Sequence, residues 1–333
     1  MDLSTRYLGL ELANPFMPGA SPMVDDLDTV RRLEDAGAAA IVMHSLFEEQ
    51  IEQEQLGISS ALDAPRDTFA EAASFLPEPE EFALGPGEYL EQLRLVQDAV
   101  DVPVIGSLNG TAAGRWLGYA QLMEEAGSNA LELNIYQVAT DAATTAEKME
   151  REVLQMVEEV RGKISIPVAV KLSPFYTAMA HFAQEVDRIG ANGLILFNRF
   201  YQPDIDVEEI IVDRRLVLSD PSELPLRLRW LAILHGRLNC SLALTGGVHQ
   251  AVDAIKAVMC GADVVQLVSA LLKWGPEHLG VVRRDFETWL EEHEYDSLAQ
   301  LKGSLSLERC PDPAVFERAN YMHILQSLGG VGF

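Results

Sequence analysis

Short runs of apolar residues recur along the chain, and each is followed by a stretch with helical periodicity. Runs such as Val168–Val170 and Leu194–Leu196 are apolar throughout, which is typical of parallel strands buried on both faces. Regular alternation of such strands with helices indicates the α/β class. The predicted strands are Phe16–Ala20, Ala40–His44, Val102–Ser107, Ala130–Asn134, Pro167–Leu172, Gly193–Asn198, Ser241–Gly246 and Asp263–Val268. Eight β/α units in succession favour a TIM (β/α)8 barrel, with a doubly wound open sheet as the alternative.

Glycines mark the points where several predicted helices end. Gly37, Gly127, Gly190 and Gly261 each stand just before a predicted strand, where a left-handed residue terminates a helix. The rhythm continues through the chain without an obvious linker. We therefore expect residues 1–333 to form a single barrel domain with a partly helical C-terminal tail.

Two connections are too long to be simple loops. One runs from about Leu46 to Gly87, after the second predicted strand, and the other from about Arg199 to Leu224, after the sixth. Both leave the C-terminal ends of strands, where barrel enzymes bind their substrates. Long excursions at that end are commonly lids or walls of a binding site.

The composition excludes several classes of function. A formal net charge of −26 disfavours nucleic-acid binding, which selects basic surfaces. No apolar run approaches the roughly 18 residues that span a bilayer, and the first residues lack the features of a signal peptide. The three cysteines have no ligand-like spacing, so we expect no metal and no iron–sulfur cluster on this chain. These features predict a cytoplasmic protein that acts on a small molecule.

Polar residues stand at or just after the C-terminal end of nearly every predicted strand. Convergence of so many polar side chains at one end of a barrel is hard to explain by capping alone, and it indicates a binding site. The set comprises Ala20-Ser21, His44-Ser45, Ser107, Asn109, Asn134, Lys171, Asn198, Thr245-Gly246-Gly247 and Ser269.

Thr245, Gly246 and Gly247 follow the seventh predicted strand, and Ser269 follows the eighth. Glycines let a phosphate approach backbone N–H groups, and a helix N-terminus carries partial positive charge. The loops after strands 7 and 8 commonly bind phosphate in this fold. We therefore predict a phosphate site here.

Lys171 ends the fifth predicted strand and is expected to point into the barrel mouth. A cation there could stabilise a reduced flavin ring, and an amine there could instead form a Schiff base with a carbonyl substrate. Asn109, Asn134 and Asn198 offer amide donors and acceptors that suit a flavin edge or a pyrimidine. His44 could donate a hydrogen bond to the cofactor or the substrate.

Several of these segments resemble the dihydroorotate dehydrogenase family, over roughly residues 3–290. Ala13–Ser21 resembles its N-terminal strand, in which Ala-Ser contacts FMN, and Leu131–Asn134 resembles its Glu-Leu-Asn strand. Val170–Pro174 looks like its Val-Lys-Leu-x-Pro segment, Leu244–Val248 like its phosphate-binding turn, and Cys260–Leu267 like its Cys-Gly-Ala-x-x-x-Gln strand. The resemblance implies an FMN barrel. Together with the strand-end residues, it predicts as cofactor contacts Ala20, Ser21, Ser45, Asn109, Asn134, Lys171, Asn198, Thr245, Gly246, Gly247 and Ser269.

The resemblance weakens where the family carries its acid/base chemistry. The soluble class has a Cys base shortly after the strand that matches Leu131–Asn134, whereas Ile135–Ala139 contains neither Cys nor Ser. His44 stands where that class has a lysine. Tyr136, His44 and Tyr176 are candidate substitutes for the base, with Lys171 beside the flavin.

The sequence thus predicts an FMN-dependent oxidoreductase that acts on the CH–CH group of dihydroorotate or of a related small polar ring or acid. Two alternatives remain: a Schiff-base lyase or aldolase that uses Lys171, and a non-catalytic flavin-binding barrel. The resemblance also implies a homodimer and a role in pyrimidine biosynthesis. It leaves open a redox partner subunit that carries FAD and an iron–sulfur cluster.

Overall fold

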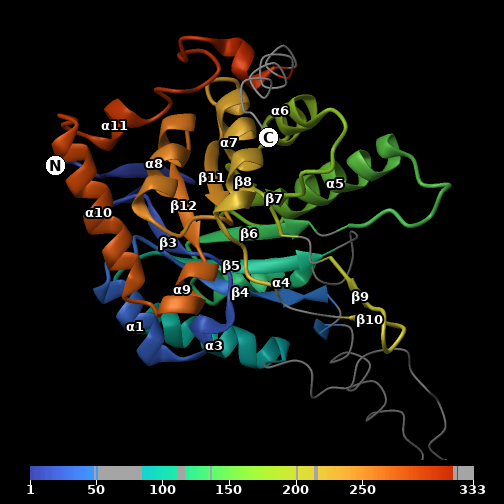
Figure 1. Ribbon diagram of the computed structural model, residues 1–333. Helices are drawn as coiled ribbons and strands as arrows, with labels where there is room; N and C mark the ends of the chain where they lie inside the picture. Colours follow the sequence, from blue (N-terminus) through green and yellow to red (C-terminus); the bar gives the residue numbers. More distant parts are fainter. Residues whose placement is uncertain are drawn as a thin grey trace, which may run out of the picture.

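Eight parallel strands form one sheet that curls into a barrel (Figure 1). The structure is a computed structural model that describes residues 1–48, 50–51, 85–110, 117–135, 137–199, 202–213, 217–317 and 321. The strands lie in the order β3 (Phe16–Pro18), β12 (Val264–Leu267), β11 (Ser241–Thr245), β8 (Gly193–Leu196), β7 (Val168–Leu172), β6 (Ala130–Ile135), β5 (Val104–Gly110) and β4 (Ile41–Phe47). The first and last strands of this order, β3 and β4, also lie side by side. Ala39 N, just before β4, donates to Phe16 O of β3 at 2.8 Å, which closes the barrel.

Each of the eight predicted strands coincides with one of these strands, so the predicted TIM barrel is confirmed. The strand positions alternate between the barrel interior and the surrounding helices. Met17, Ile195 and Ala243 belong to the interior cluster, whereas Leu131 and Leu194 belong to the layer beneath the helices. Because both faces are covered, the strands tolerate continuous apolar sequence.

Helices surround the barrel in the order of the chain (Figure 1). In the helix α5 (Ala146–Arg161), Thr145 caps the first turn and Val153, Met156 and Val160 are buried at helical spacing. The four glycines expected to end helices have φ angles between 95° and 114°. The other helices are α1 (Leu27–Asp35), α3 (Pro86–Ala99), α4 (Leu117–Glu125), α6 (Met179–Arg188), α7 (Leu224–Leu234), α8 (Ala251–Cys260), α9 (Ser269–Trp274), α10 (His278–Glu292) and α11 (Leu298–Leu301), with short 3-10 turns η1 (Pro22–Asp25), η3 (Pro221–Glu223) and η4 (Pro313–Phe316).

An N-terminal hairpin that the sequence did not reveal closes the barrel at the end opposite the mouth. It pairs β1 (Thr5–Tyr7) with β2 (Leu10–Leu12). Tyr7 and Leu8 are buried in the interior cluster, and Leu8 N donates to Ser241 Oγ at 3.1 Å. A side chain at Gly193 would lie 2.5 Å from Leu8, so the glycine makes room for the hairpin.

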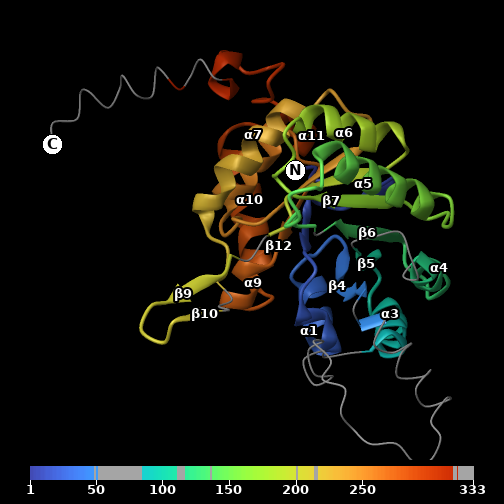
Figure 2. The same cartoon turned by 90° about the vertical axis from the view of Figure 1, so that its right-hand side faces the viewer.

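The long connection after β8 contains a second hairpin, formed by β9 (Asp204–Asp206) and β10 (Ile211–Asp213). Figure 2 shows it projecting away from the barrel. The connection after β4 lies mostly outside the described residues. In the tail, α11 and η4 agree with the expected partial helicity up to residue 317. Within the described part of the chain, no helix combines the length and apolarity needed to cross a membrane.

Candidate functional site

A hydroxyl–amide cluster lies inside the mouth of the barrel, on the adjacent strands β4, β5 and β6. Asn134 Nδ2 donates to Ser107 Oγ at 2.8 Å and to Ser45 Oγ at 3.1 Å. The two hydroxyls are themselves 2.8 Å apart. Asn134 and Ser107 are buried, so their mutual hydrogen bonds offset the cost of removing these groups from water. The cluster fixes the Asn134 amide in one orientation.

A register irregularity in β4 separates Ser45 from His44. The pairing with β5 shifts between Val42 and Ser45, which is the signature of a bulge, and the strand continues to Phe47 instead of ending at His44 as expected. Ser45 belongs to the hydroxyl–amide cluster with Ser107 and Asn134. The described contacts of His44 are with Asp25 and Tyr89, neither of which belongs to that cluster.

His44 Nδ1 lies 2.7 Å from Asp25 Oδ1, an ion-pair distance, although the groups are not aligned as a hydrogen bond. Burial lowers the pKa of His44 below 6.5, and the Asp25 carboxylate offsets part of that effect. The imidazole packs edge-on against Tyr89, whose hydroxyl donates to Ser107 O at 3.1 Å. His44 is therefore linked to the mouth through Tyr89.

Lys171 lies in the barrel interior and is held by two residues that the sequence analysis did not single out. Its Nζ lies 3.0 Å from Glu132 Oε1, and Gln266 Nε2 donates to Glu132 Oε2 at 2.8 Å. Glu132 and Gln266 are each 1% exposed, and Lys171 is 7% exposed. The sequence did contain one signal for Glu132. It lies two residues before Asn134 in the same strand, and side chains two residues apart in a strand point to the same face.

The remaining residues predicted from strand ends lie around the same mouth. Asn109 pairs with Asn134 in the register of β5 and β6. Asn198 lies two residues beyond the end of β8, where its N donates to Leu172 O at 2.7 Å. Buried Asn198 Nδ2 and Ser21 Oγ have no hydrogen-bond partner among the described residues. Ala20 packs against the interior cluster.

Asn198 lines a cavity of about 330 Å³ that also contacts Phe175 and Arg227. A separate cavity of about 470 Å³ lies beside the segment that follows β6, with Ile135, Val138 and Tyr176 in its lining. Burial, followed by the charge of Glu150, raises the pKa of Tyr176, whose ring stacks on Phe182. Tyr136 lies outside the described residues.

The turn after β11 is built from glycines that close contacts require. Gly246 and Gly247 have φ angles of 87° and 82°, in the left-handed region. A Cβ at Gly246 would lie 2.8 Å from the Arg227 guanidinium, and one at Gly247 would lie 3.1 Å from Asp220 O. The sequence correctly placed this turn beside Ser269 but did not reveal what packs against it.

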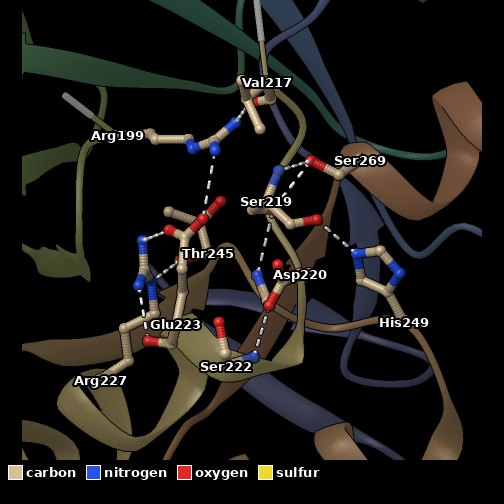
Figure 3. A network of polar contacts seen from close by, with 11 residues as sticks. Arg199, Val217, Ser219, Asp220, Ser222, Glu223, Arg227, Thr245, His249 and Ser269 are labelled. Carbon is tan, nitrogen blue, oxygen red and sulfur yellow. Dashed lines mark hydrogen bonds and ion pairs between the residues drawn. The ribbon is translucent and has the colours of Figure 1, made fainter. Parts of the chain in front are cut away.

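Ser219 joins the turn to the start of α9 (Figure 3). Its hydroxyl accepts from Gly247 N at 3.2 Å and lies 2.8 Å from Ser269 Oγ, while Ser219 N donates to Ser269 Oγ at 3.0 Å. His249 Nε2 donates to Ser219 O at 2.7 Å, which fixes the backbone of this segment. Hydroxyl and N–H groups therefore gather where a phosphate was predicted.

Arg227 supports the turn from below (Figure 3). Its Nε donates to Thr245 O at 2.6 Å, and its Nη1 donates to Glu223 O at 2.8 Å. The Glu223 carboxylate contacts both Arg227 and Arg199, at 3.4 Å and 3.2 Å. Burial lowers the pKa of Arg227. An arginine on α7 carries no local motif, so sequence reasoning could not connect it with the turn.

Comparison with known proteins identifies the family. The sequence model of the family described as dihydroorotate dehydrogenase matches residues 2–290. The chain belongs to the dihydroorotate dehydrogenase family. The matched residues span all eight barrel strands and every predicted site residue, so the family resemblance seen in the sequence is confirmed.

Individual members of the family are similar over almost the whole chain. "Dihydroorotate dehydrogenase B (NAD(+)), catalytic subunit" of Thermoplasma volcanium is 25% identical over 311 residues, which cover 91% of this chain and 98% of that protein. "Putative dihydroorotate dehydrogenase A (fumarate)" of Aeropyrum pernix is 26% identical, covering 91% and 97%. The catalytic subunit of the B type from Methanothermobacter thermautotrophicus is 24% identical, covering 90% and 97%.

Proposed function

We propose that the chain is an FMN-dependent oxidoreductase that acts on the CH–CH group of a small polar ring or unsaturated acid. The observation that carries this proposal is the arrangement of the mouth in a member of this family. A cation held at a fixed point, a rigid amide and a glycine turn that bonds a serine hydroxyl lie at the C-terminal end of one barrel. All of residues 1–333 would serve this site as one domain.

The described residues fit a flavin nucleotide. Buried polar atoms of Ser21, Asn198 and Gln266 have no partner among the described residues, as expected for atoms that face the polar edge of a ring. Side chains at Gly246 and Gly247 would collide with Arg227 and with the backbone of Asp220, so the turn requires glycines, which also leave its backbone open to a phosphate. Bound at this site, the flavin ring would accept a hydride from the substrate carbon.

The chain's own residues would bind and orient the reactants. Asn134, held by Ser45 and Ser107, presents its remaining amide oxygen in one direction. Lys171 would place positive charge beside the ring, where charge builds up on reduction. Its ion pair with Glu132 suits a fixed cation better than the free amine that a Schiff-base lyase requires, so the oxidoreductase is favoured over that alternative.

Oxidation of a CH–CH group also requires a base for the second proton. Tyr136 and His44 remain the proposed candidates. A lowered pKa keeps His44 neutral near pH 7, in the form that accepts a proton. A base commonly contributes about 10²–10⁴-fold to the rate, so replacing either residue tests its part.

Dihydroorotate is the first substrate to examine, because it appears in the names of the relatives. With this substrate the reaction yields orotate and belongs to pyrimidine biosynthesis. Two relatives are named catalytic subunits, which supports a redox partner subunit for this chain as well. We further propose a homodimer in the cytoplasm, with neither nucleic acid nor membrane as a partner.

The visible spectrum of the purified protein tests the cofactor. We expect the absorption bands of oxidised flavin, with FMN released on unfolding. Anaerobic mixing with dihydroorotate should then bleach the bands. A colourless protein that borohydride traps on its substrate would support the lyase instead, whereas a yellow protein that no donor bleaches would indicate a non-catalytic barrel.

A further inference from the structure

Glu132 occupies the centre of a buried polar triad that crosses the barrel interior. It lies on β6 and is joined to Lys171 on the neighbouring strand β7 at 3.0 Å. Its other oxygen accepts from Gln266 of β12 at 2.8 Å, a residue 134 positions away in the sequence. Both carboxylate oxygens are therefore used, and they are used on different residues.

Burying the charged and polar groups of this triad costs desolvation energy, so its presence in the barrel interior calls for a reason other than stability. Burial of an ion pair often stabilises a fold less than apolar residues of similar volume would. An apolar interior is available to this chain, because Ala169, Ile195 and Ala243 occupy the layer next to it. Neither Glu132 nor Gln266 shapes a turn or caps a helix. Their described contacts serve only to hold Lys171 and each other.

We propose that Glu132 is a positioning residue that sets the electrostatic field of Lys171 at the flavin. The inference rests on the proposed FMN function. Glu132 fixes the position of Lys171 Nζ, and its carboxylate opposes the lysine's positive charge. Gln266 holds the second carboxylate oxygen and keeps the side chain from turning toward the mouth. Lys171 and Glu132 together therefore act on the flavin as a dipole and not as an isolated cation. A dipole stabilises the negative charge of reduced flavin less than a lone cation would, so the pair lowers the affinity of the site for the reduced form.

The reduction potential of bound FMN tests this inference directly. In Glu132→Gln the amide retains the shape of the side chain but removes its negative charge. We expect at least a tenfold shift of the equilibrium toward reduced flavin, equivalent to a rise of about 30 mV for a two-electron couple. Glu132→Asp keeps the charge and should change the equilibrium less than threefold. Glu147→Gln, which removes an exposed carboxylate from α5, should leave it unchanged.

A second pair of variants protects the test against misfolding. Lys171→Met and the double variant Lys171→Met/Glu132→Gln differ only in the charge of Glu132. Because Glu132 acts through Lys171, which is absent from both variants, their potentials should differ less than threefold in the reduction equilibrium. The double variant should also fold at least as well, because both partners of the buried pair are neutral.

An unchanged potential in Glu132→Gln, or a tenfold difference in the reduction equilibrium between Lys171→Met and its double variant, would overturn the inference. A lower melting temperature without a change in potential would mean that the triad is only structural. Wild-type protein that binds no FMN would instead contradict the proposed function. The wild-type spectrum therefore separates the two failures.

Discussion

Arg227 donates to the carbonyl of Thr245 at 2.6 Å and fills the space directly beneath Gly246. The arginine lies on α7, and the carbonyl belongs to the turn predicted to bind phosphate. One side chain thus couples the outer helix layer to the barrel mouth. Arg227 is 5% exposed and its guanidinium also donates to Glu223 O, so its removal would leave buried acceptors without a donor.

Arg227→Met should therefore destabilise the fold and weaken FMN binding together. Loss of a donor to buried acceptors typically costs about 1–3 kcal/mol. Chemical denaturation measures the stability, and fluorescence titration measures FMN affinity. Arg229→Met, an exposed position on the same helix, is the matched control and should change neither. Unaltered FMN affinity in Arg227→Met would argue against coupling between the helix and the turn.

Gly246→Ala should be harmful for a different reason. The position has a φ angle of 87°, and its new methyl group would lie 2.8 Å from Arg227. Left-handed backbone costs an L-residue about 1–2 kcal/mol even without such a clash. We expect a lower unfolding midpoint and weaker FMN binding. Gly118→Ala is a control that should change stability in the opposite direction. This glycine lies in α4, and a Cβ added to it would have nothing within 4 Å. That change should stabilise the helix by roughly 0.5–1 kcal/mol.

Asn134→Ala tests the hydroxyl–amide cluster. The change removes the amide that bonds both Ser45 and Ser107, and we expect kcat/KM to fall by about 10²-fold, as for the loss of other preorganised polar groups. FMN should still bind, because Lys171 and the phosphate turn remain. Steady-state kinetics and the flavin spectrum give the two readouts. Gln155→Ala on the exposed face of α5 should have no effect on either. Full activity of the alanine variant would remove Asn134 from the proposed site.

The stability of the fold should decline as the pH falls below about 6.5. Burial lowers the pKa of His44 and of His235 from 6.5 in the folded chain. The unfolded chain therefore takes up these protons first, and the free energy of unfolding decreases between 6.5 and the lower folded values. Above that range both forms are neutral and the contribution is constant.

Urea denaturation at a series of pH values measures this slope. The double variant His44→Gln/His235→Gln should have a shallower slope over the same interval. Replacing the exposed His181 should leave the slope as it is in the wild type. A double variant with the full wild-type slope would assign the pH dependence to the carboxylates instead.

Local sequence signals predicted the barrel strands and the strand-end residues. Apolar runs and the glycines before them are sufficient for that, because both act within a few residues of the chain. The bulge between Val42 and Ser45 depends on pairing with β5, so the sequence wrongly ended that strand at His44. Glu132 and Gln266 are hydrogen-bonded although 134 positions separate them in the sequence. Local periodicity relates residues only a few positions apart, so it could not predict this contact.

The hairpin β1–β2 was missed for a related reason. Its strands are three residues each, and the burial of Leu8 depends on the empty space at Gly193. Ser219 and Arg227 were likewise missed because their partners lie on other elements. Prediction from sequence therefore located the mouth and several of its side chains, while the residues that hold them in place required the structure.

The N-terminal hairpin also constrains the order in which the protein can be made. Leu8 bonds Ser241, Thr5 bonds the carbonyl of Asp263, and Leu298 N bonds Asp2 O, so residues 2–8 leave the ribosome more than 200 residues before their partners. Contacts this distant in sequence form slowly, and domains generally complete folding only after their full chain has emerged. The barrel floor must therefore stay open, with Tyr7 and Leu8 exposed, for most of translation. We expect nascent chains to need protection from aggregation during that interval.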